Sequence, residues 1–284
     1  MTNTLFTFGH GFSASALARL LVPLGWTLYG TTRSPANFGK ISEQGVTPLL
    51  FPGSDLRDAL AQTTHLLLSA APGENGDPVL AEFGSNMAEL MPDLQWAGYL
   101  STTGVYGDHA GGWVDETTPL TPASKRGQHR VMAETQWQSL GLPLHIFRLA
   151  GIYGPGRGPF AKVRRGTARR IIKPDQVFSR IHVDDIAQTV LASINRPNPG
   201  AIYNLCDDDP APPQDVIGHA ATLLGLPLPL AEDYATADMT PMAQSFYAEN
   251  KRVRNDRIKS ELGVSLLYPS YREGLSALLA KETD

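Results

Sequence analysis

Leu5-Phe6-Thr7-Phe8-Gly9-His10-Gly11-Phe12-Ser13-Ala14 is the stretch that decides the fold. A short apolar run leads into a Gly-x-Gly-x-x-Ala turn, and leucines then recur at helical spacing over 17–24. The order strand, glycine turn, helix is typical of the phosphate site for a dinucleotide. Gly9 permits the tight turn, Gly11 lets the backbone approach a pyrophosphate, and Ala14 lets the helix pack closely on the strand. The N–H groups that begin the helix would face the phosphates.

The residues expected to contact the dinucleotide lie in this turn and after a later strand. The turn contributes Gly9, His10, Gly11, Phe12, Ser13 and Ala14. The apolar run over 65–70 ends in Ala70 and Ala71, which we also expect to touch the cofactor. His10 either faces the phosphates or lies on the surface of the turn. The alternative for the whole stretch is a glycine-rich turn without a ligand.

The end of the second expected strand indicates which dinucleotide binds. An NAD site usually has an acidic residue there, which binds the ribose hydroxyls. This chain has Thr32-Arg33-Ser34 instead, and no acid occurs before Glu43. Arg33 is placed to bind a 2′-phosphate, with Thr32 and Ser34 as hydroxyl donors. We therefore predict NADP as the cofactor, and NAD is the alternative if Arg33 is only a solvated loop residue.

Strand-like and helix-like segments alternate through the first half of the chain. Apolar runs typical of strands follow the first helix at 27–32, 47–51, 65–70, 97–103 and 145–150. Helical patterns lie near 55–63, 77–92 and 123–140. This alternation predicts an α/β fold with a doubly wound parallel sheet, the Rossmann fold. A ligand would lie at the carboxyl ends of the strands.

Beyond about residue 155 the pattern loosens. A helix is expected over 184–195 and a last strand over 202–205, whereas the stretches 207–215 and 225–242, rich in proline and acidic residues, indicate loops. We predict a dinucleotide-binding domain over residues 1–155, with returning segments near 181–206. A smaller C-terminal substrate lobe is then expected over 156–180 and 207–284.

The composition excludes several other classes of protein. An apolar fraction of 42% over 284 residues supports a sizeable core, and a net charge of −4 gives no reason to expect nucleic acid or a membrane surface as partner. A single cysteine, Cys206, excludes an internal disulfide framework and fits a reducing compartment. There is no signal-peptide pattern and no membrane-length apolar run. We expect a cytoplasmic protein without a metal site.

The sequence Leu-Ser-Thr-Thr-Gly-Val-Tyr-Gly over 100–107 resembles the strand and loop of the extended short-chain dehydrogenases/reductases, which include nucleotide-sugar epimerases and dehydratases. Further stretches agree with that family in order, and together they span nearly the whole chain: Val114–Pro119, Arg148–Gly156, Ile181–Ala187, Leu262–Gly263 and Tyr271–Leu275. The resemblance implies a nicotinamide cofactor and a small-molecule substrate. It also implies a homodimer.

The family's chemistry uses a serine or threonine and a Tyr-x-x-x-Lys pair, in which the tyrosine acts as the base. Thr102 matches the first position. Counting back from Glu134 puts Arg126 at the tyrosine position and Arg130 at the lysine position. Arginine stays protonated, so Arg126 is a poor base. The chain therefore resembles the atypical members, which keep the cofactor site but lack the catalytic pair.

A basic segment after Pro159 suggests an anionic substrate. It contains Lys162, Arg164, Arg165, Arg169, Arg170 and Lys173. In the resembled family this region covers the substrate, and phosphate recognition would explain such charge density. A solvated face or a subunit contact is the alternative. Arg157, Arg180 and the stretch Ser245–Asn250, which precedes Lys251 and Arg252, are expected at the same cleft.

Two functions remain open from the sequence. The first is an NADP(H)-binding oxidoreductase or epimerase/dehydratase-like enzyme that acts on a small, phosphate-bearing molecule, with His129 as a substitute base or merely a surface histidine. The second is a non-catalytic dinucleotide-binding redox sensor or scaffold. Nucleic-acid binding through 162–173 is disfavoured, because the net charge is negative and no aromatic platform accompanies the segment.

Overall fold

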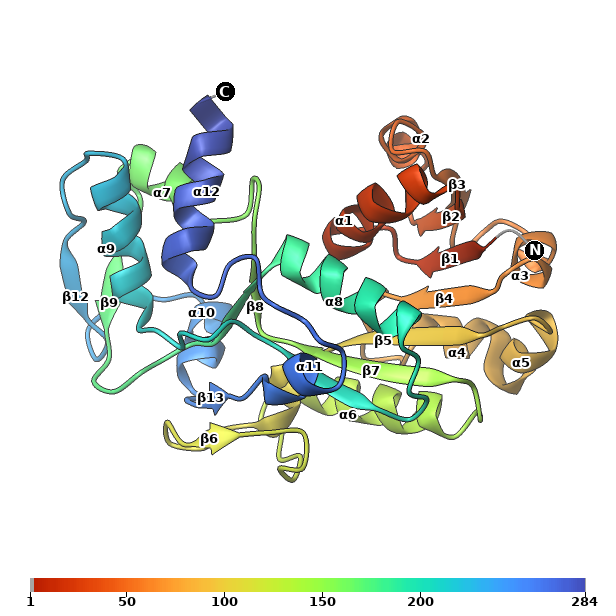
Figure 1. Cartoon of the computed structure of the whole chain (residues 1–284). Coiled ribbons are helices and arrows are strands. Elements are labelled where there is room, and N and C mark those ends of the chain that lie inside the picture. Colours follow the sequence, from red (N-terminus) through yellow and green to blue (C-terminus); the bar gives the residue numbers. More distant parts are fainter. Residues whose placement is uncertain (1–2, 284) are drawn as a thin grey trace.

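A parallel sheet of seven strands forms the centre of the computed structural model, which describes residues 3–283 (Figure 1). Its strand order is β11-β7-β5-β4-β1-β2-β3. The strands are β1 (Thr4–Phe8), β2 (Thr27–Thr32), β3 (Thr47–Leu50), β4 (His65–Leu68), β5 (Trp96–Thr102), β7 (Leu144–Leu149) and β11 (Ile202–Leu205). The predicted α/β fold with a doubly wound parallel sheet is therefore confirmed.

Helices cover both faces of this sheet (Figure 1). One face packs against α1 (Phe12–Leu21), α2 (Phe38–Ser42), α8 (Val183–Asn195) and α11 (Asp256–Ser260). The other packs against α3 (Arg57–Ala61), α4 (Pro78–Phe83), α5 (Met87–Leu90) and α6 (Lys125–Gln138). Because successive strand residues point to opposite faces, Leu5 enters the first core while Phe6 and Phe8 enter the second. Burial on both faces explains why these strands read as continuous apolar runs.

The sheet changes its winding direction between β1 and β4. The chain leaves β1 through α1 toward β2, and it leaves β4 through α4 and α5 on the opposite face toward β5. The two strand ends lie so close that a Cβ on Gly9 would sit 2.9 Å from the Ala70 nitrogen. A crevice at such a switch point is the usual ligand site of an open α/β sheet.

The remaining elements form a smaller lobe beside the sheet, on the left in Figure 1. They are β8 (Gly151–Tyr153), α7 (Phe160–Arg164), β9 (Arg170–Ile172), β10 (Arg180–His182), α9 (Pro213–Leu223), β12 (Ala231–Asp233), α10 (Pro241–Tyr247) and α12 (Tyr271–Thr283). The lobe has its own core, in which Phe160, Ala220 and Leu275 are buried. The short strands β6 (Trp113–Val114) and β13 (Arg252–Val253) pair and link the sheet domain to the C-terminal part of the chain.

The chain continues between these elements through short 3-10 turns, at Val22–Leu24, Pro35–Asn37, Gly84–Asn86 and Thr103–Tyr106. Over residues 3–283 no helix combines the length and apolar character needed to cross a bilayer. Within the same range no cluster of three or more histidine, cysteine or acidic side chains is placed to hold a metal ion. The two stretches expected as loops are loops only in part, since α9 begins at Pro213 and β12 lies over Ala231–Asp233.

Candidate functional site

The turn from β1 to α1 presents backbone N–H groups to the crevice. Gly9 has φ +84°, and its N–H donates to Thr31 Oγ1 at 2.8 Å, which ties the turn to β2. Gly11 is the N-cap of α1, and no side chain caps the helix. A Cβ on Gly11 would meet nothing closer than Gly9 O at 3.9 Å, so the space in front of the helix is open. Uncapped N–H groups facing open space fit the pyrophosphate of a dinucleotide.

His10 lies in the same turn, but its side chain is held elsewhere. A Cβ on Gly30 would sit 2.8 Å from the Cβ of His10, so the two residues are in close contact. The His10 Nε2 lies 3.1 Å from Gln44 Oε1. Burial lowers the pKa of His10 below its usual 6.5, against the opposing effect of the Gln44 hydrogen bond. A contact between this imidazole and the phosphates stays a prediction.

Arg33 follows the end of β2 and is exposed. Within residues 3–283 its guanidinium makes no hydrogen bond or ion pair, so it is free to meet a ligand. The neighbouring Thr32 hydroxyl is engaged, because it accepts from Asn37 Nδ2 at 3.0 Å and from the Ser34 N–H at 3.3 Å. Among the three residues predicted at this strand end, Arg33 therefore has the greatest freedom to bind a phosphate.

A cavity of about 910 Å³ extends from the crevice to the smaller lobe. Ser13 at the start of α1 and Ser69 after β4 line its wall on the side of the β1–α1 turn. Thr102, Arg126 and Arg130 line it from β5 and α6, so the structure brings the three predicted catalytic positions to one cavity. The lobe contributes Tyr153, Arg157, Phe178, Arg180, Phe246, Tyr247, Glu249 and Lys251.

The start of α6 is pressed against the turn that follows β5. A Cβ on Gly127 would sit 2.9 Å from Gly104 O, and Thr102 Oγ1 accepts from the Gly104 N–H at 3.1 Å. One turn along the helix, Arg130 Nη1 donates to Leu100 O at 2.7 Å and to Tyr99 OH at 3.0 Å. These contacts explain why α6 presents its first-turn side chains to the cavity.

Arg126 makes a different kind of contact. Its guanidinium lies 5.8 Å from the centre of the Phe246 ring on α10. Within residues 3–283 it has no hydrogen bond or ion pair, so this ring is the contact that places it. His129, the alternative base, is half-buried and does not line the cavity. No histidine lines the cavity within the part of the chain that the structure describes.

A buried polar network behind the cavity was not predicted from the sequence. Glu134 accepts from Ser101 Oγ and from Arg148 Nη2, the latter at 2.8 Å. Arg148 Nη1 donates to Tyr106 OH at 3.0 Å, and that hydroxyl donates to Asn204 Oδ1 at 2.7 Å. The network joins β5, α6, β7 and β11, so it holds the elements that carry Thr102 and Arg130. The pairing of Arg148 with Glu134 could not be seen in the sequence, because the two residues come from different elements.

The basic segment lies elsewhere than expected. None of its six cationic residues lines the cavity. Arg164 pairs with Glu282 and Arg169 pairs with Glu232, and both pairs are on the surface of the lobe. The aromatic and polar stretch expected at the cleft does reach it, since Ser245, Phe246, Tyr247, Glu249 and Lys251 line the cavity. Lys125, which also lines it, was missed.

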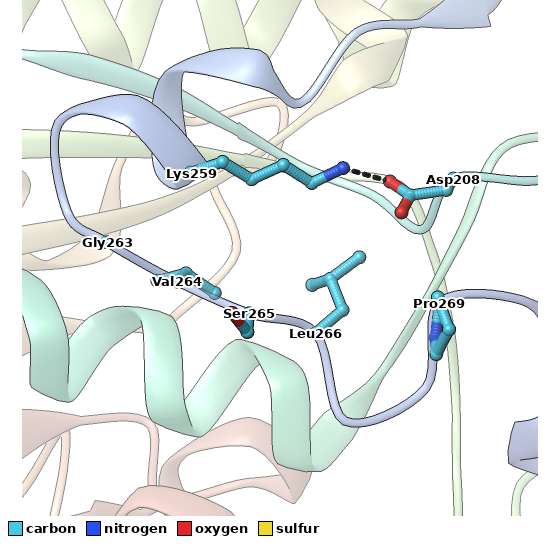
Figure 2. Close-up of a pocket in the computed structure, with 7 residues that line it drawn as sticks. All are labelled: Asp208, Lys259, Gly263, Val264, Ser265, Leu266 and Pro269. Carbon is cyan, nitrogen blue, oxygen red and sulfur yellow. Dashed lines mark hydrogen bonds and ion pairs between the residues drawn. The ribbon is translucent and has the colours of Figure 1, made fainter.

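A second hollow, of about 450 Å³, lies between the loop after β11 and the loop before α12 (Figure 2). Lys259 Nζ and Asp208 Oδ1 lie 2.6 Å apart across its edge, as the dashed line in Figure 2 marks. Gly263, Val264, Ser265, Leu266 and Pro269 complete the lining. The charged groups of this hollow neutralise each other, so we place no chemistry there.

Known sequences similar to this chain include one protein of nearly the same length and one reductase. Protein YeeZ of Escherichia coli (strain K12) is 29% identical over 282 residues, which cover 92% of this chain and 94% of that protein. A 3-diazoavenalumate denitrifying reductase of a Streptomyces species is 30% identical over 143 residues, which cover 46% of this chain and 45% of the reductase. No family model matches the chain.

Solved structures show the same architecture. A conserved protein of unknown function from Silicibacter pomeroyi DSS is 61% identical, with a TM-score of 0.95 and full coverage of both chains. A dTDP-glucose 4,6-dehydratase from Bacillus anthracis in complex with NAD has a TM-score of 0.80 at 17% identity, covering 99% of this chain and 96% of the other. A UDP-glucuronic acid 4-epimerase from Bacillus cereus with NAD has a TM-score of 0.77 at 17% identity, covering 98% and 96%. The latter two have the fold of the extended short-chain dehydrogenases/reductases that the sequence resembles.

Proposed function

The chain belongs to the same family as the Silicibacter pomeroyi protein and has the fold of the NAD-dependent epimerases and dehydratases, and on that premise we propose that it is an NADP(H)-dependent reductase of an anionic small molecule. The observation that carries the proposal is the cavity, which joins the N-terminal end of α1 to the arginines of α6. The partial match to a Streptomyces reductase supports the reaction type.

The residues at one end of the cavity would bind the cofactor, and Thr102 would contact the substrate. Gly9, Gly11 and the uncapped N–H groups of α1 hold the pyrophosphate, and Arg33 binds the 2′-phosphate of NADP by a charge-assisted contact. The bound nicotinamide supplies hydride chemistry. Thr102 Oγ1 already accepts a hydrogen bond from the Gly104 N–H, so its own O–H is left to donate a hydrogen bond to a substrate oxygen.

The arginines decide which reactions this chain can support. Arg126 and Arg130 stay protonated at ordinary pH, so neither takes a proton from a substrate hydroxyl as the family's tyrosine does. Fixed positive charges instead stabilise negative charge that develops on a bound substrate. Reduction of an electron-poor group, in which the bound nicotinamide would supply the hydride and solvent water the proton, profits from such stabilisation and needs no base in this position. For that reason we favour a reductase over an epimerase or dehydratase.

The test is a comparison of NADPH and NADH binding by isothermal titration calorimetry. Arg33→Ala should weaken NADPH binding by about 1.5–3 kcal/mol, the range for a hydrogen bond to a charged group, and should hardly change NADH binding. Lys40→Ala is the matched control, because Lys40 is an exposed, unpaired cation on nearby α2 in the described chain. Equal affinities for both cofactors, or the same loss in both variants, would refute the role of Arg33.

A second candidate function is a dinucleotide-binding sensor or scaffold without turnover. It is favoured by the replacement of both proton-transferring residues by arginines in a cavity that otherwise keeps the fold's layout. A substrate screen that follows NADPH fluorescence separates the two candidates. NADPH binding without oxidation by any carboxylate- or phosphate-bearing carbonyl compound would favour the sensor.

A further inference from the structure

The cavity is lined by cations that form no ion pair within 4.0 Å among the described residues. These are Lys125, Arg126, Arg130, Arg157 and Arg180. Within residues 3–283 none of the five has a carboxylate oxygen within 4.0 Å. The one acid of the lining, Glu249, pairs with Lys251 at 2.6 Å and so neutralises a sixth cation. The cavity therefore carries a net positive charge that a ligand would have to balance.

Two of these cations, Arg157 and Arg180, have contacts that account for their positions without a substrate. The Arg157 guanidinium lies 5.7 Å from the centre of the ring of Phe12, the first residue of α1, near the helix start proposed to hold the dinucleotide phosphates. Arg180 lies beside the buried carboxyl group of Asp207, and its Nη1 donates to Phe178 O at 2.8 Å and to Ala211 O at 3.0 Å. Lys125, Arg126 and Arg130 remain, and all three belong to α6.

The placement of these three cations is unfavourable for the protein without a ligand. Lys125 and Arg126 are the first two residues of α6, where the helix dipole is positive, and the first turn contains no acid. Arg130 follows Arg126 by four residues, so the two like charges share one face of the helix and repel each other. Arg164 and Arg169 on the surface of the lobe, by contrast, are paired with Glu282 and Glu232.

We propose that Lys125, Arg126 and Arg130, the α6 cation cluster, bind the phosphate or carboxylate group of the substrate. Arg126, at the position of the family's catalytic tyrosine, is then a binding residue for negative charge. Its guanidinium contacts the Phe246 ring and makes no hydrogen bond or ion pair among the described residues, so its N–H groups are left for an oxyanion. Arg130 Nη1 donates to Leu100 O and Tyr99 OH, and the other guanidinium nitrogens can donate to the ligand. The inference rests on the proposed function, because it takes this cavity as the substrate site.

The experiment measures binding of inorganic phosphate and of malonate to the protein saturated with NADPH. Saturation fills the cofactor's phosphate subsites, and sodium chloride keeps the ionic strength constant. Arg126→Ala should weaken binding of the preferred probe tenfold or more, and Arg126→Lys should weaken it less, since it keeps the charge. Arg165→Ala is the control for loss of one charge, because Arg165 is exposed, has no acidic partner among the described residues and lies outside the cavity.

The outcomes separate this inference from the proposed function. Failure of NADPH to bind would refute the proposed function itself. NADPH binding without saturable binding of either probe, or equal probe affinity in wild type and Arg126→Ala, would overturn the α6 cation cluster alone. Preference for phosphate would identify a phosphate ester as substrate, and preference for malonate would identify a carboxylic acid. A melting temperature for ligand-free Arg126→Ala no lower than that of wild type would show that the lost binding does not reflect lost folding.

Discussion

The arginines of strand β7 and helix α6 occupy two contrasting environments. Arg148 on β7 is buried with its side chain 4% exposed, and it pairs with Glu134, which is 3% exposed, at 2.8 Å. Arg126 and Arg130 on α6 line the cavity and have no acidic partner in the described chain. The guanidinium of Arg148 is paired and hydrogen-bonded within the protein, whereas those of Arg126 and Arg130 have no paired acid among the described residues.

This contrast separates arginines that support the fold from arginines that await a ligand. A buried charge must be paired and hydrogen-bonded, because leaving it unpaired costs several kcal/mol. Cations at the edge of a cavity cost far less, because solvent reaches them. The chain keeps such cations together where they repel each other, which is expected of a binding site and not of a stabilising surface.

The strongest test of the contrast is the removal of the buried partner. Arg148→Ala leaves the Glu134 carboxylate buried without its cation and should lower the free energy of unfolding by about 3–5 kcal/mol. Arg126→Ala should change it by no more than about 0.5 kcal/mol, since it alters only a solvated ring contact. Urea unfolding followed by circular dichroism measures both. Equal losses in the two variants would mean that the two environments do not differ as the structure indicates.

The carboxyl group of Asp207 gives a second test of buried charge, because it is buried next to Arg180. Within residues 3–283 neither of its oxygens makes a hydrogen bond of good geometry. Burial raises its pKa from 3.8 to about 8, against the opposing effect of the Arg180 guanidinium. Because the pKa of Asp207 is higher in the folded protein than in the unfolded chain, folding favours the protonated carboxyl group. The contribution of this group to stability is therefore complete below pH 3.8 and is lost as the pH rises toward 8.

Asp207→Asn should therefore become more stable relative to wild type as the pH rises from 4 to 8. The difference in unfolding free energy should grow by up to about 1.4 kcal/mol per pH unit, the value of one proton taken up or released. Asp93→Asn is the control, since Asp93 is exposed and its replacement should give a difference that hardly depends on pH. A flat profile for Asp207→Asn would show that this carboxyl group is ionised in the folded protein.

The sheet could be predicted from the sequence because strands and turns are marked by short stretches of neighbouring residues. Each of the seven strands appears as an apolar run, and the glycine turn fixes where the first helix begins. Boundaries moved by a few residues, as with β4, which ends at Leu68 where the run continues to Ala70. The lobe was less predictable, because its short strands pair over long sequence separations, as β12 does with β9.

The site was predictable only where a motif or a resemblance fixed positions. Counting back from Glu134 placed Arg126 and Arg130, and both line the cavity. Charge density alone pointed to the basic segment over 162–173, none of whose six cations lines the cavity. Two of them, Arg164 and Arg169, pair with Glu282 and Glu232 far along the chain. Lys125 was overlooked because the sequence shows only a single cation at the start of a helix. Its position in the cavity, without an acidic partner among the described residues, is visible only in the structure.

The smallest expected effect is at Lys125, and it tests whether the α6 cation cluster costs stability. Lys125→Glu puts an acid in the first turn of α6, where it complements the helix dipole, and should raise the free energy of unfolding by about 0.3–1 kcal/mol. Lys125→Gln, which only removes the cation, should give a smaller gain of the same sign. Gln138→Glu, at the other end of α6, should give a loss instead, because an acid opposes the dipole there. Thermal unfolding at low salt resolves these differences, and added salt should shrink all three. A loss of stability in Lys125→Glu would mean that Lys125 has a structural partner, and the cluster would then lose one of its three cations.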